Sequence, residues 1–257
     1  MKTNTLVMLA GPGKPTHILY HALKNDFPIE TVVLEEPVPR TEFLRRRIQR
    51  LGFFKVLGQI LFQIGMVPYL RMISQKRILE LMEEFKLNDE PIHEVKITRV
   101  RSVNSDETLG ILKEVHPSVV VISGTRIISD KVLNCVPSKF LNIHAGITPL
   151  YRGVHGAYWA LVENNPKACG VTVHLVDTGI DTGKILEQQV VEPTEKDNFV
   201  TYPLLQLATG IPLLKKAIQE VFENRIEIKP YPEGRSRLWS HPTLAEYLRY
   251  RIYRGVK

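Results

Sequence analysis

Three polar residues have the types and spacing that chemistry on a carbonyl group would need: Asn142, His144 and Asp181. Asn142 and His144 are separated by one residue, so in a strand their side chains would lie on the same face. An amide N–H can donate to an oxygen that becomes negative, and an imidazole can accept the proton of an attacking amine. Asp181 follows on a later loop and could orient the imidazole. We therefore expect acyl transfer to an amine, although a lone histidine on a strand is more often structural.

The three residues follow apolar runs of strand length, and the surrounding elements predict how they are positioned. We expect strands at residues 5–10, 31–35, 95–100, 119–123, 140–144, 171–176 and 185–191, and helices at residues 17–24, 106–115, 156–164 and 204–223. Strands that alternate with helices are typical of an α/β fold with a mostly parallel sheet flanked by helices. Ligands of such sheets bind beyond the carboxyl ends of the strands, which is where Asn142 and His144 lie.

The composition of the 257-residue chain favours a globular protein with an anionic partner, because 44% of the residues are hydrophobic and the formal net charge is +7. Cys135 and Cys169 lack paired spacing, so we expect neither a disulfide nor a metal site. The apolar run 6–10 is too short for a secretion signal, and the run 51–70 is interrupted by Lys55 and Pro68. We therefore expect a cytoplasmic protein without a transmembrane segment.

The pattern along the chain predicts a catalytic domain at residues 1–223, with a helical insertion at 40–86, and a C-terminal extension at 224–257. The insertion is basic and apolar at helical spacing. It could bind an anionic membrane surface or a phosphorylated ligand, or it could cover the sheet with its arginines in water, which is the more common arrangement. A final helix rich in Tyr and Arg could mediate a homodimer or simply pack on the surface.

Four motifs extend the pattern around the candidate residues. They are NIH at 142–144, PLYRG at 149–153, GVTVH at 170–174 and DTGIDTG at 177–183. Together they resemble the folate-dependent formyltransferase family, whose members include glycinamide ribonucleotide transformylase, methionyl-tRNA formyltransferase and enzymes that N-formylate nucleotide-linked amino sugars. The detailed resemblance covers residues 119–189. It implies a Rossmann-like domain that moves a formyl group from 10-formyltetrahydrofolate to an amine.

The resemblance also implies a role for individual residues. Asn142 would hold the formyl oxygen, His144 would be the general base and oxyanion partner, and Asp181 would assist His144 and an ordered water. Folate would lie between two loops, one with Arg126, Ile127 and Ile128, the other with Val176, Asp177, Thr178, Gly179 and Ile180. Arg126 could equally cap the following helix or pair with an acid. No metal is implied.

The acceptor amine is expected near the first strand and the PLYRG motif, with candidate residues Gly11, Gly13, Lys14, Tyr151 and Arg152. Backbone amides and the lysine of the turn GPGK could meet a phosphate, but an ordinary strand-to-helix turn explains the same residues. His174, on an apolar strand, is interpreted as a core histidine.

We expect the acceptor to be a small anionic amine, above all a nucleotide-linked amino sugar, and not a nucleic acid. The turn GPGKPTH differs from the Gly-x-Gly-Ser-Asn loop typical of glycinamide ribonucleotide transformylases. The 34 residues after Glu223 are too few for the C-terminal barrel that helps methionyl-tRNA formyltransferases hold tRNA. These two activities remain alternatives, as does a non-catalytic module that binds folate or nucleotide.

Overall fold

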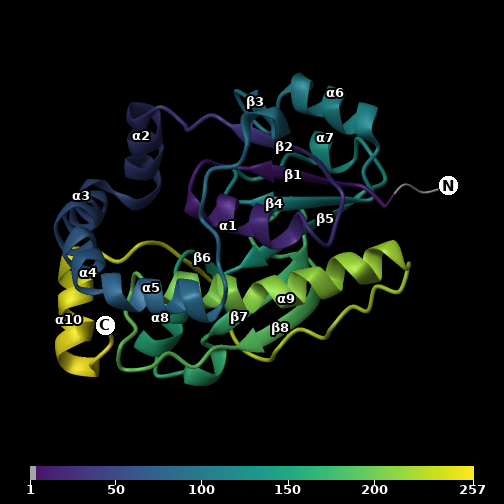
Figure 1. The fold of residues 1–257 in the computed structure, drawn as a ribbon. Coiled ribbons are helices and arrows are strands. Elements are labelled where there is room, and N and C mark those ends of the chain that lie inside the picture. Colours follow the sequence, from purple (N-terminus) through teal and green to yellow (C-terminus); the bar gives the residue numbers. More distant parts are fainter. Residues whose placement is uncertain (1–3) are drawn as a thin grey trace.

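A seven-stranded sheet forms the centre of the protein, whose computed structural model describes residues 4–257 (Figure 1). The strand order is β3-β2-β1-β4-β5-β7-β8. The strands are β1 (Leu6–Ala10), β2 (Ile29–Glu35), β3 (Ile97–Val100), β4 (Val119–Ser123), β5 (Lys139–His144), β7 (Gly170–Leu175) and β8 (Ile185–Val190). Strands β1 to β5 pair in parallel, whereas β7 runs antiparallel to both of its neighbours. The predicted α/β fold with a mostly parallel sheet is confirmed.

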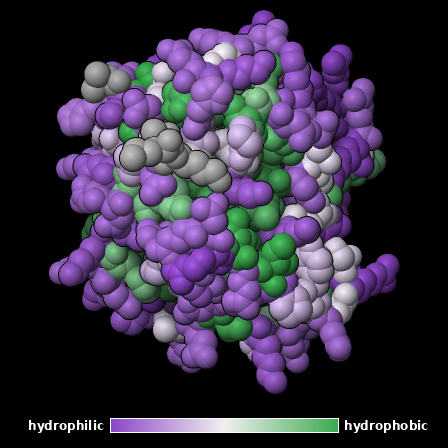
Figure 2. All heavy atoms as spheres, turned by 90° about the vertical axis from the view of Figure 1, so that its right-hand side faces the viewer, coloured by the Kyte–Doolittle hydropathy of each residue, from purple (hydrophilic) through white to green (hydrophobic). Residues whose placement is uncertain are grey.

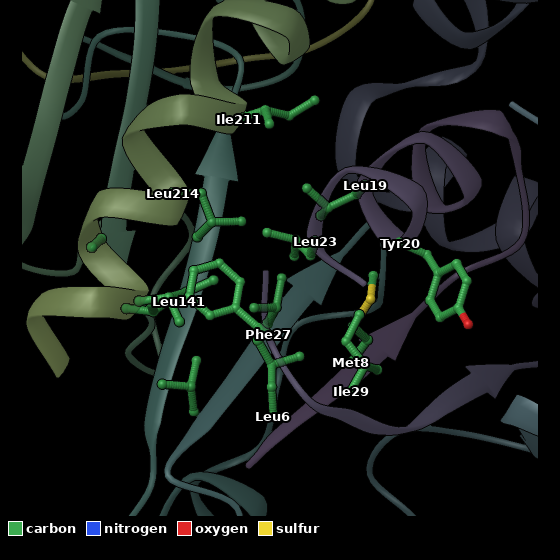
Figure 3. Packing of buried hydrophobic residues seen from close by; sticks show 14 of the residues in the cluster. Leu6, Met8, Leu19, Tyr20, Leu23, Phe27, Ile29, Leu141, Ile211 and Leu214 are labelled. Carbon is green, nitrogen blue, oxygen red and sulfur yellow. The ribbon is translucent and has the colours of Figure 1, made fainter. Parts of the chain in front are cut away.

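Alternation along the strands gives the sheet two apolar faces, each covered by helices. On one face Leu6 and Met8 pack against α1 (Lys14–Leu23) and α9 (Tyr202–Phe222), as Figure 3 shows. On the other face Val7 and Leu9 pack with α6 (Asp106–Val115) and α7 (Asp130–Leu133). Because both faces are covered, the central strands β1 and β4 are buried at every position, which is typical of parallel sheets.

The insertion is helical, as its spacing predicts; residues 53–73 lie beside the C-terminal segment (Figure 1), whereas the buried Leu81 packs with Val171 of β7 and Leu205 of α9. It comprises α2 (Arg40–Leu51), α3 (Phe53–Leu61), the π-helical turn η1 (Phe62–Met66), α4 (Val67–Ile73) and α5 (Gln75–Glu84). Phe62 and Leu70 join a second apolar core with α8 (Gly156–Val162) and α10 (Leu244–Arg254). The short 3-10 turns η2 (Glu94–Lys96) and η3 (Pro166–Ala168) complete the helical elements.

The helical run from Phe53 to Ile73 is continuous through η1 and has 21 residues with a mean hydropathy of 1.4. By length and composition alone it could cross a membrane, which differs from the expectation for 51–70. Pro68 lies in the first turn of α4, where a missing N–H is tolerated, so it does not interrupt the helix. Length and composition are weak evidence for a span, because helices of soluble proteins can meet the same criteria.

A small second sheet joins the C-terminal extension to the centre of the chain. Strand β6 (Tyr151–Gly153) pairs in parallel with β9 (Arg237–Trp239). The Trp239 ring stacks on Trp159 of α8 with ring centroids 4.5 Å apart. Neither strand was expected from the sequence, because three residues are too few to show an alternating pattern.

Candidate active site

The structure brings His144 and Asp181 into contact at the carboxyl edge of β5. Asn142 and His144 both belong to β5, whereas Asp181 lies on the loop between β7 and β8. The distance from His144 Nδ1 to Asp181 Oδ1 is 3.3 Å. The imidazole is buried and the Asp181 side chain is mostly buried, so their interaction is little screened by water.

The His144 ring lies between two hydrogen-bond acceptors. Its Nε2 is 2.7 Å from the carbonyl oxygen of Tyr151, and its Nδ1 faces the Asp181 carboxylate. Because a carbonyl oxygen can only accept, Nε2 must carry a proton in this contact. The other ring nitrogen, Nδ1, lies next to the Asp181 carboxylate, which can also accept a hydrogen bond. Both ring nitrogens of His144 therefore face acceptors, one a backbone oxygen and the other a carboxylate.

Hydrogen bonds from Arg152 and Gly153 hold Asp181 and its loop in place. Its φ angle is 52°, in the left-handed region that aspartate adopts more readily than most residues. Its Oδ2 accepts a hydrogen bond from Gly153 N at 2.9 Å, and Arg152 Nη1 donates to the carbonyl oxygen of Ile180 at 3.2 Å. Burial alone would raise the pKa of the Asp181 carboxyl, but the contact with His144 and the Gly153 hydrogen bond outweigh it and lower the pKa.

His174 is part of the site, which the sequence interpretation missed. It lies opposite Asn142 in the β5–β7 pair. Its Nδ1 donates to the carbonyl oxygen of Leu175 at 2.8 Å, which leaves Nε2 to accept from Asn142 Nδ2 at 3.2 Å. Burial lowers the pKa of His174, which favours this neutral form. His174 therefore fixes which way the Asn142 amide points and leaves its second N–H free for another acceptor.

Two glycines leave no room for a side chain beside the histidines. A Cβ on Gly146 would lie 2.4 Å from Tyr151 O and 2.7 Å from His144 Nε2. A Cβ on Gly183 would lie 1.6 Å from Leu175 O, the acceptor of the His174 ring. The close approach of backbone to both rings thus requires glycine at these positions. Gly183 belongs to the DTGIDTG motif, but nothing in the sequence marked Gly146.

The first candidate folate loop presents one of its three residues to solvent. Ile127 is 55% exposed, whereas Ile128 is buried in the core beneath α6 and α7. The Arg126 guanidinium donates to the carbonyl oxygens of Glu36 at 2.7 Å and Arg101 at 3.2 Å, and it lies 3.4 Å from the Glu35 carboxylate. Arg126 thus pairs with an acid, which is one of the alternatives considered from the sequence. Its hydrogen bonds also connect the loops that contain Glu36 and Arg101. An exposed apolar Ile127 fits a flat aromatic ligand, and Ile128 could contribute only its backbone.

The second candidate folate loop borders a surface pocket of about 390 Å³. Val176, Asp177 and Thr178 line it, together with Phe140 and residues of α7. The Asp177 carboxylate is used locally, since it accepts from Gly179 N at 3.0 Å and from Thr182 Oγ1 at 2.7 Å. None of Asn142, His144 and Asp181 lines this pocket, so it adjoins the catalytic edge without containing it.

The candidate acceptor residues are mostly engaged within the protein. Lys14 forms an exposed ion pair of 2.5 Å with Asp89, and a Cβ on Gly11 would lie 2.3 Å from Gly124 O, so Gly11 serves close packing of two turns. Gly13 has a φ of 138° and precedes α1 without a side-chain cap, but Pro15 has no N–H and Thr16 N donates to Gly13 O at 3.1 Å, so the first turn offers few free amide groups. The Tyr151 hydroxyl donates to Glu163 at 3.0 Å, so Tyr151 serves His144 through its backbone.

An α/β protein whose sheet edge carries an amide, an imidazole and a carboxylate has the construction of an acyl-transfer enzyme. Residues 64–203, more than half of the chain, match the family described as formyl transferase, and the chain belongs to this family. A methionyl-tRNA formyltransferase from Kosmotoga olearia is 29% identical over 137 residues, which are 53% of this chain and 44% of that protein. The match therefore spans less than half of that relative.

Two solved structures share the fold at low sequence identity. A sugar N-formyltransferase from a Shewanella species has a TM-score of 0.57 and 17% identity, over 91% of this chain and 77% of that one. The phosphoribosylglycinamide formyltransferase from Streptococcus pneumoniae has a TM-score of 0.55 and 17% identity, over 86% and 99% of the two chains. At this identity the likeness concerns the fold alone.

Proposed function

We propose that this protein transfers a formyl group from 10-formyltetrahydrofolate to a primary amine. The observation that carries the proposal is the contact between His144 and Asp181 beside Asn142, at the carboxyl edge of a sheet of the formyl transferase family. In the transfer, a bond forms between the amine nitrogen and the formyl carbon, and the bond from that carbon to N10 of the folate breaks. The amine loses one proton and N10 gains one.

The residues of the site divide this chemistry between them. Asn142 donates its second amide N–H to the formyl oxygen as that oxygen becomes negative, because the first N–H is held by His174. His144 receives the amine proton at Nδ1, because its Nε2 already donates to Tyr151 O, and the Asp181 carboxylate faces Nδ1. An oxyanion donor of this kind contributes roughly 3–4 kcal/mol to catalysis, and a general base about 10²–10⁴-fold in rate.

We assign the folate to the space between Ile127 and the 176–180 loop. Exposed apolar surface at Ile127 and the position of this loop next to Asp181 support the assignment. A related structure, an N-formyltransferase from Helicobacter canadensis, is described in complex with folinic acid and dTDP-3-aminofucose, with a TM-score of 0.53 and 18% identity. When bound, the folate supplies the formyl carbon.

The acceptor we favour is the amino group of a nucleotide-linked sugar. Several sugar N-formyltransferases share the fold over about nine tenths of this chain, among them the Shewanella enzyme and the dTDP-bound enzyme above. The formal charge of +7 suits a ligand with a diphosphate. Such a product belongs in polysaccharide biosynthesis.

The experiment is a formyl-transfer assay with matched variants. The protein is incubated with 10-formyltetrahydrofolate and a panel of nucleotide-linked 3-amino and 4-amino sugars, and release of tetrahydrofolate is followed. Asn142→Ala and His144→Gln should each lower turnover by about 10²-fold or more. His116→Asn is the control, because His116 is exposed at the end of α6 in a left-handed conformation that Asn also adopts. Normal turnover by His144→Gln would refute the assignment.

Methionyl-tRNA is the second candidate acceptor, because the sequence relatives with 27–33% identity are methionyl-tRNA formyltransferases. The same assay therefore includes charged initiator tRNA and glycinamide ribonucleotide. Turnover with tRNA alone would replace the sugar assignment and leave the formyl-transfer chemistry in place. Tight folate binding with no turnover of any amine would instead favour a binding module.

A further inference from the structure

The helical run Phe53–Ile73 turns polar side chains toward the protein and apolar ones toward solvent. On the inner side Gln59 is 1% exposed, and its Nε2 donates to the carbonyl oxygen of His241 at 2.6 Å and to Ser240 Oγ at 3.2 Å. Gln63 donates to His241 Nδ1 at 3.0 Å. Apolar residues such as Phe62 also lie on this side, but the two glutamines are the residues a water-facing surface would normally carry.

Most of the exposed side chains of the same run are apolar. We call this surface the apolar face, and it consists of the exposed residues Phe53, Phe54, Leu57, Leu61, Ile64, Tyr69, Met72 and Ile73. Phe54 is 85% exposed, Ile64 68% and Met72 66%. Residues 54, 57, 61 and 64 follow one another at steps of three or four, so they form one stripe of the helix. A stripe of this size marks an interaction surface.

Helix α10 extends the apolar surface at the same end of the molecule. It packs on α3 and η1 (Figure 1) and exposes Ile252 and Tyr253. Figure 2 views the opposite end, where the surface is mostly hydrophilic and the apolar areas are smaller and separated by polar side chains. The concentration of exposed apolar residues is therefore a property of one end of the protein.

The charges around the apolar face are of one sign. Between Phe43 and Leu79 the sequence has eight basic residues and no acidic residue. Five of the basic residues are exposed and form no ion pair within the described part of the chain, namely Arg45, Arg50, Lys55, Arg71 and Lys76. Apolar side chains flanked by unpaired cations are complementary to a bilayer with anionic headgroups, which offers acyl chains below a negative surface.

We propose that the apolar face docks this protein on the surface of an anionic membrane. The run lies in the plane of the interface and does not cross it, because Gln59 and Gln63 are bonded to the C-terminal segment. A second copy of the chain is the other occupant an apolar face could have. A two-fold interface would place the same basic residues of both subunits against each other, without an acidic residue of 43–79 to pair with them. The charge pattern thus favours lipid.

The first test is co-sedimentation with vesicles of phosphatidylglycerol mixed with phosphatidylcholine, and with vesicles of phosphatidylcholine alone. We expect binding to the anionic vesicles that weakens as salt is raised. The variant Phe54→Glu/Ile64→Glu should reduce the bound fraction about tenfold, because it places two charges where acyl chains would lie. The control Val190→Glu/Ile228→Glu alters two exposed apolar residues outside the run, on β8 and in the 224–236 segment, and should bind as the unmodified protein does.

Two further measurements make the result decisive. Far-ultraviolet circular dichroism of both double variants checks that the helices are retained, as expected for exposed positions. Sedimentation velocity without lipid compares their mass with that of the unmodified protein, and equal masses are expected. Absence of binding to anionic vesicles, or equal binding by Phe54→Glu/Ile64→Glu, would overturn the proposal. A dimer that Phe54→Glu/Ile64→Glu converts to a monomer would overturn it in favour of self-association.

Discussion

Two half-buried histidines predict that the protein loses stability in mildly acidic solution. His155 and His241 lie between α8, the insertion and the C-terminal segment, with His155 Nε2 3.0 Å from His241 Nδ1. Gln63 Nε2 also lies 3.0 Å from that Nδ1. Because an amide nitrogen only donates, His241 Nδ1 must be the acceptor and His155 Nε2 the donor. A proton on His241 Nδ1 would remove both hydrogen bonds.

The sign of the effect follows from the shift of both histidine pKa values. Burial lowers the pKa of His155 to about 3 and that of His241 to about 4. The charge of His241 also lowers the pKa of His155, and the charge of Arg47 lowers that of His241. An unfolded chain protonates histidine near pH 6.5. Below that pH the unfolded state therefore binds more protons than the folded state, so stability is complete above about pH 6.5 and falls as the pH is lowered toward the folded-state pKa values.

The magnitude can be worked from the same values. Each pH unit below about 6.5 removes up to about 1.4 kcal/mol of the free energy of unfolding for each histidine that stays neutral when folded. For the two residues together, the change from about pH 6.5 to about pH 5.5 is roughly 2–3 kcal/mol. The free energy of unfolding of a typical domain is only about 5–15 kcal/mol, so the urea concentration at the midpoint of unfolding should change clearly.

The measurement is urea unfolding followed by the fluorescence of Trp159 and Trp239, between about pH 7.5 and about pH 5.5. Both indoles lie beside the histidine pair, since Trp159 Nε1 donates to Ser240 O at 3.0 Å and the two rings are stacked. The variant His155→Gln/His241→Asn should show a much smaller slope of stability against pH, whereas His116→Asn should keep the slope. An unchanged slope in the double variant would refute the reasoning.

Three other predictions concern the site and a helix end. Asp181→Asn should lower turnover by about 10²–10⁴-fold, because the protonated His144 loses its anionic partner; the formyl-transfer assay measures this, and near-normal turnover would contradict it. Gly146→Ala should lower turnover at least about tenfold, because its Cβ would displace the His144 ring; circular dichroism should be unchanged, and a fully active variant would show that the ring position is unimportant. Thr243→Ala should cost about 1 kcal/mol, since it removes the capping box with Glu246 at the start of α10; urea unfolding measures this, and an unchanged midpoint would contradict it.

The sequence predicted the main sheet and the convergence of His144 and Asp181, because both depend on strong local signals. Apolar strands bounded by turns identify β4 at Val119–Ser123 without error, and α6 at Asp106–Val115 begins at the capping residue Ser105. The two-residue spacing of Asn142 and His144 requires only that β5 be a strand. The family of the chain could be stated from its motifs for the same reason, and the match over residues 64–203 confirms it.

Long-range pairing limited the rest of the interpretation. His174 looked like a core residue, because the sequence does not show that it faces Asn142 across β5 and β7. The partner of His144 is the backbone oxygen of Tyr151, and a backbone contact leaves no trace in residue type. The orientation of the insertion was also beyond prediction, since α3 is apolar on its outer side and the usual rule would bury that side.

The pairing of β6 with β9 links the end of the chain to the chemistry near its middle. Gly153 of β6 donates its N–H to Asp181, Tyr151 of β6 offers its oxygen to His144, and both residues pair with β9. A stop codon before Arg237 would leave the seven-stranded sheet complete and remove the strand that braces these two backbone groups. The same truncation would take Tyr247 and the rest of α10 out of the second apolar core, so the C-terminal segment supports both the folding of this end of the protein and the geometry of the site.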